Sequence, residues 1–207
     1  MAKEVGAVIR DRKIDVILLF WSLVLGFSAS HTRGIASTRR TYEMASGTTV
    51  APSSFYNRFS KVFVKFLRAA LMKAVETTGK TMTRSLQGVW GHFRDILIAD
   101  CTVVRLHRLL EKHFKGCRAA AGAKVHVVMS VKACGASTVK ISDERTKETC
   151  KLVISSNIEG KLLLVDLGYY WFNLFSRIVR NGGFFISRLK KNANLLVLEE
   201  HMQWRGI

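Results

Sequence analysis

The sequence predicts an α/β fold: a mixed β-sheet with helices, preceded by an all-helical N-terminal region. Residues 161–192 have the pattern of a strand, a helix and a second strand, and a crossover helix makes two such strands parallel neighbours. An earlier apolar run, residues 96–99, also ends at an aspartate, and further strand candidates lie between the two. Residues 1–92 show helical periodicity instead. At 207 residues, the chain can bury a substantial core.

The first predicted helix, Val16–Phe27, is an apolar run that follows a basic segment and precedes small residues. Basic, apolar and then small is also the pattern of a signal peptide, so an exported or membrane-associated basic protein is an alternative. Asp15 interrupts the start of the run, however, and twelve apolar residues are too few to span a bilayer. We therefore expect a buried core helix and no membrane partner.

Two more helices are expected before residue 77. A short one around Ile35–Ala45 is followed by Gly47, which suits a helix stop. A longer one covers Ser54–Glu76, and Ser53 or Ser54 can cap its N-terminus. The apolar stripe of this long helix consists of Phe55, Phe59, Phe63, Phe66 and Ala70.

The long helix also carries a basic stripe, with side chains at spacings of three and four: Arg58, Lys61, Lys65 and Arg68. A short helix, a tight turn and a capped helix resemble a helix-turn-helix, whose second helix lies on DNA. The alternative is the solvated face of a helical bundle. The stripe predicts a helical DNA-binding region at residues 1–92.

Residues 77–161 are expected to change from helix to strand. Asp100 follows an apolar strand, Ile96–Ala99. The other segments, in order, are a polar break at Thr77–Thr83, a helix at Ser85–His92, a helix at Leu106–Phe114, a loop at Gly116–Ala123, strands at Val125–Val131 and Thr138–Ile141, a loop at Asp143–Lys147 and a short apolar segment at Leu152–Ile154.

The strand–helix–strand unit begins with Leu162–Val165, a continuous apolar run typical of a strand buried on both faces, and Asp166 follows it. A helix at Leu167–Arg180 comes next, and Asn181–Gly183 can stop it with a positive φ. The apolar face of this helix is expected to contain Phe172, Phe175 and Val179. The second strand, Phe184–Leu189, ends in a basic cluster: Arg188, Lys190 and Lys191.

Asp100 and Asp166 occupy matching places, because each follows four apolar residues. An antiparallel meander followed by a strand–helix–strand unit is the order of the ribonuclease H-like fold, in which two aspartates on neighbouring strands meet at one edge of the sheet. Neighbouring carboxylates suit hard cations, Mg²⁺ or Mn²⁺. Two such ions can activate water or a 3′-hydroxyl and stabilise the leaving oxygen of a phosphodiester. The alternative for either aspartate is a turn residue or a helix cap.

The charge of the chain points to a polyanionic partner. It has 33 Lys and Arg against 15 Asp and Glu, a formal net charge of +18. Such an excess favours nucleic acid first and an acidic membrane surface second, with a generally basic soluble protein as the alternative. The four cysteines show no metal-binding spacing, so a zinc site is not expected and reduced cytosolic thiols are the simplest interpretation. No glycine-rich phosphate loop or small-molecule site is recognisable.

Three phrases resemble DDE transposases of the fourth insertion-sequence family: RDILIADCTVVRLH at 94–107, the stretch LLLVDLGYYWFNLFSRIVRNGGFFISRLKKNAN at 162–194, and GTTVAPSSFYNRF at 47–59. The resemblance implies that Asp100 and Asp166 match the first two catalytic acids. It implies that the basic segment after the second strand lies near DNA. It also implies metal-dependent cleavage at transposon ends followed by strand transfer, by a homodimer on double-stranded DNA in the prokaryotic cytoplasm, at the nucleoid.

The sequence departs from this family at the third acid, a glutamate within a tyrosine–arginine–glutamate–lysine signature that is not found here. The two-metal site is therefore expected to be incomplete and the chain truncated. Asp143 and Glu144 precede Asp166, in the wrong order to replace the glutamate, and Glu199 and Glu200 lie in a stretch that looks like the beginning of an insertion. We expect residues 93–194 to form an incomplete ribonuclease H-like core and residues 195–207 to be the start of an insertion or a truncated tail. The predicted function is transposase-type DNA binding with crippled cleavage; the alternative is a non-catalytic fragment that competes for transposon ends.

Overall fold

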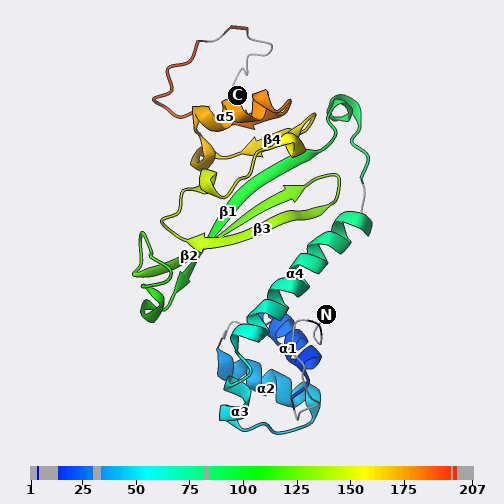
Figure 1. The fold of residues 1–207 in the computed structure, drawn as a ribbon, viewed down its shortest axis with the longest axis vertical. Coiled ribbons are helices and arrows are strands. Elements are labelled where there is room, and N and C mark those ends of the chain that lie inside the picture. Colours follow the sequence, from blue (N-terminus) through cyan, green and yellow to red (C-terminus); the bar gives the residue numbers. More distant parts are fainter. Residues whose placement is uncertain (1–3, 5–13, 30–33, 82–83, 197, 200–207) are drawn as a thin grey trace, which may run out of the picture. The chain divides into compact units, whose positions relative to one another are not determined.

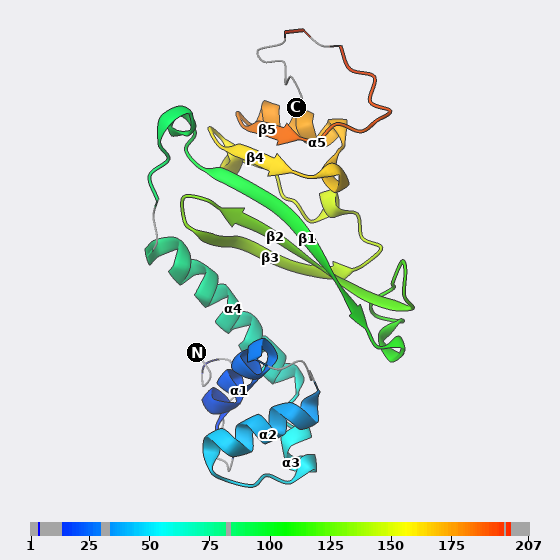
Figure 2. The ribbon, with the colours of Figure 1, turned by 180° about the vertical axis from the view of Figure 1, so that it is seen from behind.

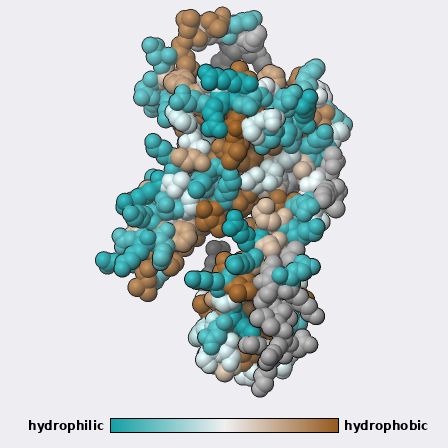
Figure 3. Space-filling model, viewed as in Figure 1, coloured by the Kyte–Doolittle hydropathy of each residue, from teal (hydrophilic) through white to brown (hydrophobic). Residues whose placement is uncertain are grey.

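The structure, a computed structural model, describes residues 4, 14–29, 34–81, 84–196 and 198–199 (Figure 1). The chain divides into two compact units, Met1–Ala74 and Val75–Ile207. Hydrophilic side chains, drawn in teal, are distributed over the visible face of each unit rather than gathered in one patch (Figure 3). None of the helices within the described ranges combines the length and the apolarity that a bilayer span requires.

The first unit is helical, as predicted. It contains α1 (Val16–Ala29), α2 (Ile35–Ser46), α3 (Pro52–Tyr56) and the first part of α4 (Lys61–Thr81). Asp15 accepts hydrogen bonds from the backbone of Ile17 and Leu18, at 2.6 and 3.2 Å, so the acid that interrupts the apolar run caps α1. The core of this unit is built around fully buried Leu19, Tyr42 and Phe55.

The predicted helix Ser54–Glu76 is wrong as a single element, because a turn at residues 57–60 separates α3 from α4. Helix α3 begins at Pro52, whose missing N–H costs nothing in the first turn. Ser60 then accepts a hydrogen bond from the backbone of Phe63 at 3.3 Å, which starts α4. The phenylalanine stripe nevertheless continues across the break, since the rings of Phe55, Phe59, Phe63 and Phe66 contact one another in sequence.

Two predictions at the junction with the second unit are also wrong. Helix α4 runs to Thr81 instead of stopping at a polar break after Glu76. The predicted helix Ser85–His92 is reduced to a 3₁₀ turn at Gly88–His92. Thr77, Thr78 and Gly79 have lower helix propensity than alanine, but propensity is a weak prior that tertiary packing overrides.

The second unit is a five-stranded sheet in the order β3-β2-β1-β4-β5 (Figures 1 and 2). Strands β1 (Ile96–Leu106), β2 (Ala121–Ser130) and β3 (Gly135–Asp143) form an antiparallel meander. Strands β4 (Leu162–Val165) and β5 (Phe184–Ser187) continue the sheet parallel to β1. This mixed α/β arrangement confirms the ribonuclease H-like fold class.

Pairing with β2 changes the segments beside β1. Strand β1 extends through Asp100 to Leu106, and the helix predicted at Leu106–Phe114 is wrong: only a 3₁₀ turn at Arg108–Leu110 is present there. The predicted loop Gly116–Ala123 gives way to β2 at Ala121. The antiparallel ladder with β2 keeps the chain in a strand as far as Leu106, which pairs with Ala121.

Helix α5 (Phe172–Arg180) covers one face of the parallel strands (Figure 1). It begins later than predicted, because Leu167–Tyr169 form a 3₁₀ turn first. Its buried side chains are Leu174, Phe175 and Ile178, so the predicted apolar face was only partly right: Phe172 and Val179 are 57% and 60% exposed. The Phe175 ring stacks on Phe185 of β5 with centroids 4.2 Å apart, and Gly182 ends the helix region with φ of 69°.

Candidate functional site

Asp100 and Asp166 lie side by side at the carboxyl ends of the parallel strand pairing. Ala99 of β1 pairs with Val165 of β4, and Asp100 and Asp166 are the residues that directly follow this pair. Asp166 directly follows β4, as expected. Asp100 is inside β1 rather than at its end, because β1 continues along β2 after β4 has stopped. Both side chains are exposed, which leaves their oxygens available to a ligand.

A third charged residue extends this row. Val165 pairs with Ser187 of β5, so Arg188 occupies the position next to Asp166. Its Nη1 atom lies 3.4 Å from the Asp166 carboxylate, and the two side chains are 75% and 61% exposed. A solvated ion pair of this kind contributes little to stability. Releasing the Asp166 carboxylate to bind a phosphate therefore costs Arg188 little free energy.

On the face of the sheet that carries Asp100, Asp166 and Arg188, the residues two positions earlier in each strand are apolar. The register places Met129, Ile98, Leu164 and Ile186 in a row across β2, β1, β4 and β5. Ile98, Met129 and Ile186 are exposed. Helix α5 packs on the opposite face, with Leu163 and Val165. Successive residues of a strand point to opposite faces, so the acids and this exposed apolar row share one face.

Two adjacent carboxylates have the donor chemistry that Mg²⁺ and Mn²⁺ prefer. Within the described ranges, no group of three His, Cys, Asp or Glu side chains is placed to hold a metal ion. Asp143 ends β3 and accepts hydrogen bonds from Thr146, while Glu144 accepts one from the backbone of Cys117 at 2.9 Å. The residues present fit a divalent cation with two protein ligands.

The opposite face of β1 carries a polar network that the sequence did not predict. The thiol of Cys101, the residue after Asp100, interacts with the Glu148 carboxylate. Burial, then this interaction and the charge of Glu148, raise the pKa of Cys101 to about 12. Lys124 Nζ lies 3.6 Å from Glu148 Oε1, with both side chains largely buried. Sequence spacing has no signal for Glu148, because a long connection brings it back to the sheet.

His126 belongs to the same buried face, beside Cys101 in the strand register. Its Nε2 atom is 2.8 Å from Ser142 Oγ, and its Nδ1 atom has no partner among the described residues. Burial, and next the charge of Lys124, lower the pKa of His126 below its usual value. The ring is therefore kept neutral, which argues for a packing role rather than proton transfer to the acids.

The predicted DNA-contacting residues fall in two places. Lys61, Lys65 and Arg68 are exposed on α4 of the first unit, whereas Arg58 is half-buried in the turn before it. Lys190 and Lys191 are exposed in the second unit after β5, beyond Arg188. Lys190 Nζ lies 5.4 Å from the centre of the Tyr170 ring.

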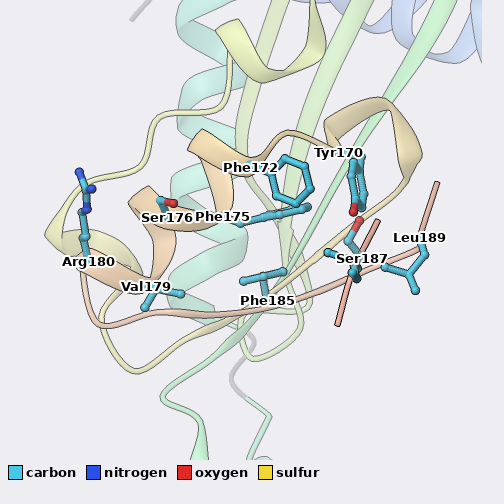
Figure 4. Close-up of a pocket in the computed structure, with 10 residues that line it drawn as sticks. Tyr170, Phe172, Phe175, Ser176, Val179, Arg180, Phe185, Ser187 and Leu189 are labelled. Atoms are coloured by element: carbon cyan, nitrogen blue, oxygen red, sulfur yellow. The ribbon is translucent and has the colours of Figure 1, made fainter. Parts of the chain in front are cut away.

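A pocket of about 470 Å³ lies between α5, β5 and the segment that follows β5 (Figure 4). The aromatic side chains of Tyr170, Phe172, Phe175 and Phe185 form part of its lining. Arg180 lies at one side, and Ser187 and Leu189 at the other.

Comparison with known proteins places this geometry in context. Residues 91–205 match the family model described as the transposase DDE domain. The chain is 24% identical over 156 residues to the transposase for insertion sequence element IS231F of Bacillus thuringiensis subsp. israelensis, covering 73% of this chain and 33% of that protein.

Two further relatives are similar. The transposase for IS231B of Bacillus thuringiensis subsp. berliner is 22% identical over 95% of this chain and 42% of its own length. The transposase for IS1151 of Clostridium perfringens is 23% identical over 75% of this chain and 34% of its own length. The chain thus spans about two fifths or less of the length of these relatives.

Proposed function

Because the chain belongs to the transposase DDE domain family, we propose that it binds double-stranded DNA at transposon ends and presents Asp100 and Asp166 to the phosphodiester that is cut. The observation that carries this proposal is the register of β1 and β4, which puts the two aspartates side by side within the matched residues 91–205. The family supports a role in DNA transposition, with a divalent metal ion and DNA as its general requirements.

The two carboxylates would hold Mg²⁺ or Mn²⁺, and a bound ion supplies Lewis acidity at a phosphate oxygen and charge neutralisation in the displacement. Arg188 is positioned to bind the phosphate next to the one that reacts, because its planar guanidinium forms paired hydrogen bonds with phosphate oxygens. Lys190 and Lys191 extend the same basic segment, where they would neutralise the following phosphates of the strand.

We further propose that this 207-residue polypeptide alone cleaves DNA poorly or not at all. Its described residues bring two carboxylates together, whereas the family resemblance implies a third acidic ligand. Fewer carboxylates mean weaker binding of a hard cation and poorer control of its position. A second candidate function follows from the same observation: a non-catalytic DNA-binding form that occupies transposon ends and competes with a complete transposase.

The remaining assignments are part of the same proposal. Residues 1–92 form the DNA-binding region, with Arg58, Lys61, Lys65 and Arg68 as phosphate contacts, and residues 93–194 form the incomplete catalytic core. The protein acts in a prokaryotic cytoplasm at the nucleoid, as a homodimer on paired ends. The +18 net charge supports a polyanionic partner.

The test uses a duplex that contains a transposon end, incubated with the purified chain in Mg²⁺ or Mn²⁺. Nicking that is slow and is lost in Asp100→Asn, while end binding is retained, supports the catalytic proposal. Asp143→Asn is the matched control, since this acid lies two strands away and bonds Thr146. Undiminished nicking in Asp100→Asn would rule out the proposed role of the pair. End binding without nicking in any variant favours the competitor function.

A further inference from the structure

Glu148 is in contact with both of the segments that carry the acids. On one side its carboxylate interacts with the thiol of Cys101, which follows Asp100 in β1. On the other side it lies against Gly168, two residues after Asp166, so closely that a side chain at Gly168 would collide with the carboxylate. The Glu148 side chain therefore contacts both the strand that carries Asp100 and the turn that follows Asp166.

Glu148 is itself held in place. Lys124 of β2 forms an ion pair with it at 3.6 Å, and the Lys124 and Glu148 side chains are only 12% and 21% exposed. Lys124 Nζ also donates to the carbonyl of Thr146 at 3.2 Å, which ties down the connection just before Glu148. Lys140 Nζ donates to the carbonyl of Lys151 at 2.9 Å and secures the other side. Because these contacts fix the Glu148 side chain, Glu148 can in turn fix the positions of the residues that it contacts.

The turn after Asp166 is anchored by Tyr169, which is buried in the core of the second unit. Its backbone is closed by the amide of Tyr169, which donates to the carbonyl of Asp166 at 3.0 Å, and by that of Tyr170, which donates to Leu167 at 3.1 Å. Gly168 is exposed within this turn. Glycine at this position leaves the space that the Glu148 carboxylate occupies, so a larger residue would displace that carboxylate.

We propose that Glu148 is a positioning residue for the acid pair: through Cys101 and Gly168 it sets the separation of the Asp100 and Asp166 carboxylates and thereby the affinity of the pair for a divalent cation. This inference rests on the proposed function of the pair. Glu148 itself points into the face of the sheet opposite to the acids and is not a ligand. Removing residues that orient metal ligands costs roughly 10–100-fold in metal affinity.

The experiment titrates the purified 207-residue chain with Mn²⁺ alone and follows free Mn²⁺ by its electron paramagnetic resonance signal. Glu148→Gln is expected to weaken binding about tenfold, as an outer residue of a metal site does. Glu144→Gln removes the same charge from the same connection, but its carboxylate bonds Cys117, so binding is expected to stay unchanged. Equal weakening by both variants would overturn the positioning role.

A second variant separates position from charge. If Glu148 acted only through its negative charge, Lys124→Met would remove a positive charge and tighten Mn²⁺ binding. If Glu148 acts by position, Lys124→Met releases it and weakens Mn²⁺ binding. Cys101→Ser retains a hydrogen-bond donor and should bind as the native chain does, whereas Cys101→Ala should bind as Glu148→Gln does. Tighter binding by Lys124→Met would contradict the proposal.

Failure of the proposed function gives a different result. If the acids do not bind the cation, Asp100→Asn leaves Mn²⁺ binding as it was. The positioning role then still has a metal-free readout, which is amide hydrogen exchange. Glu148→Gln should speed exchange at Tyr169 and Tyr170 and leave the β1–β2 ladder protected. Unchanged exchange at these two amides would overturn the role of Glu148 without reference to metal.

Discussion

The exposed basic face of α4 predicts a specific change in the salt dependence of DNA binding. Lys61, Lys65 and Arg68 are exposed at spacings of four and three, so they share one side of the helix. Each phosphate contact contributes about −0.9 to the slope of log K against log salt concentration. Three contacts amount to about −2.7. Replacing all three with alanine should make the slope shallower by that amount; Arg58, half-buried in the preceding turn, is left in place.

The assay is fluorescence anisotropy of a labelled duplex titrated with the purified chain at several salt concentrations between about 50 and 200 mM, the range in which counterion release is large. The control replaces Arg40, Lys112 and Arg118, three exposed basic residues outside α4, with alanine. This control variant removes the same net charge as the α4 variant does. If the control changes the slope as much as the α4 variant does, binding follows the +18 net charge and the α4 face has no special part. An unchanged slope in the α4 variant would refute the reasoning directly.

Three further predictions concern the second unit. Ile178→Ala should cost about 3 kcal/mol in urea unfolding, because its side chain is fully buried, whereas Val179→Ala at an exposed position should cost little; equal losses would contradict the observed face of α5. His126 is neutral in the fold, so the unfolded chain binds its proton more readily and stability should fall as pH decreases below 6.5; His126→Asn should reduce that pH dependence, measured by unfolding at two pH values. Ile186→Lys should reduce self-association in sedimentation experiments, because Ile186 belongs to the exposed apolar row, while Met44→Lys in the first unit should not.

The parallel part of the sheet was predictable because its signals are local. Leu162–Val165 is a continuous apolar run, and β4 has these same bounds. The helix ending before Gly47 was similarly clear, since Gly47 has φ of 65° and glycine adopts that conformation without strain. Two apolar runs ending in aspartate, in this strand order, were sufficient to expect that Asp100 and Asp166 lie on neighbouring strands.

Other elements depended on partners that local sequence does not reveal. Leu106–Phe114 has helical spacing, yet β1 continues to Leu106 because β2 is available to pair with it. The buried face of α5 was misassigned because the 3₁₀ turn at Leu167–Tyr169 delays the helix start, and contact with the sheet then selects Leu174 and Ile178. The break between α3 and α4 follows from Ser60, whose capping of Phe63 competes with a continuous helix.

The sequence by itself determined the fold class, the strand order around the two aspartates and the basic character of the protein, which favours a polyanionic partner. Apolar periodicity, glycine stops and net charge are properties of short segments or of the whole composition. Only the tertiary structure decided which residues surround the acids. Arg188 reaches Asp166 through the register of β5 with β4, and Glu148 reaches Cys101 because the connection after β3 folds back onto the sheet. Such contacts join residues 22 and 47 positions apart, and no local pattern specifies them.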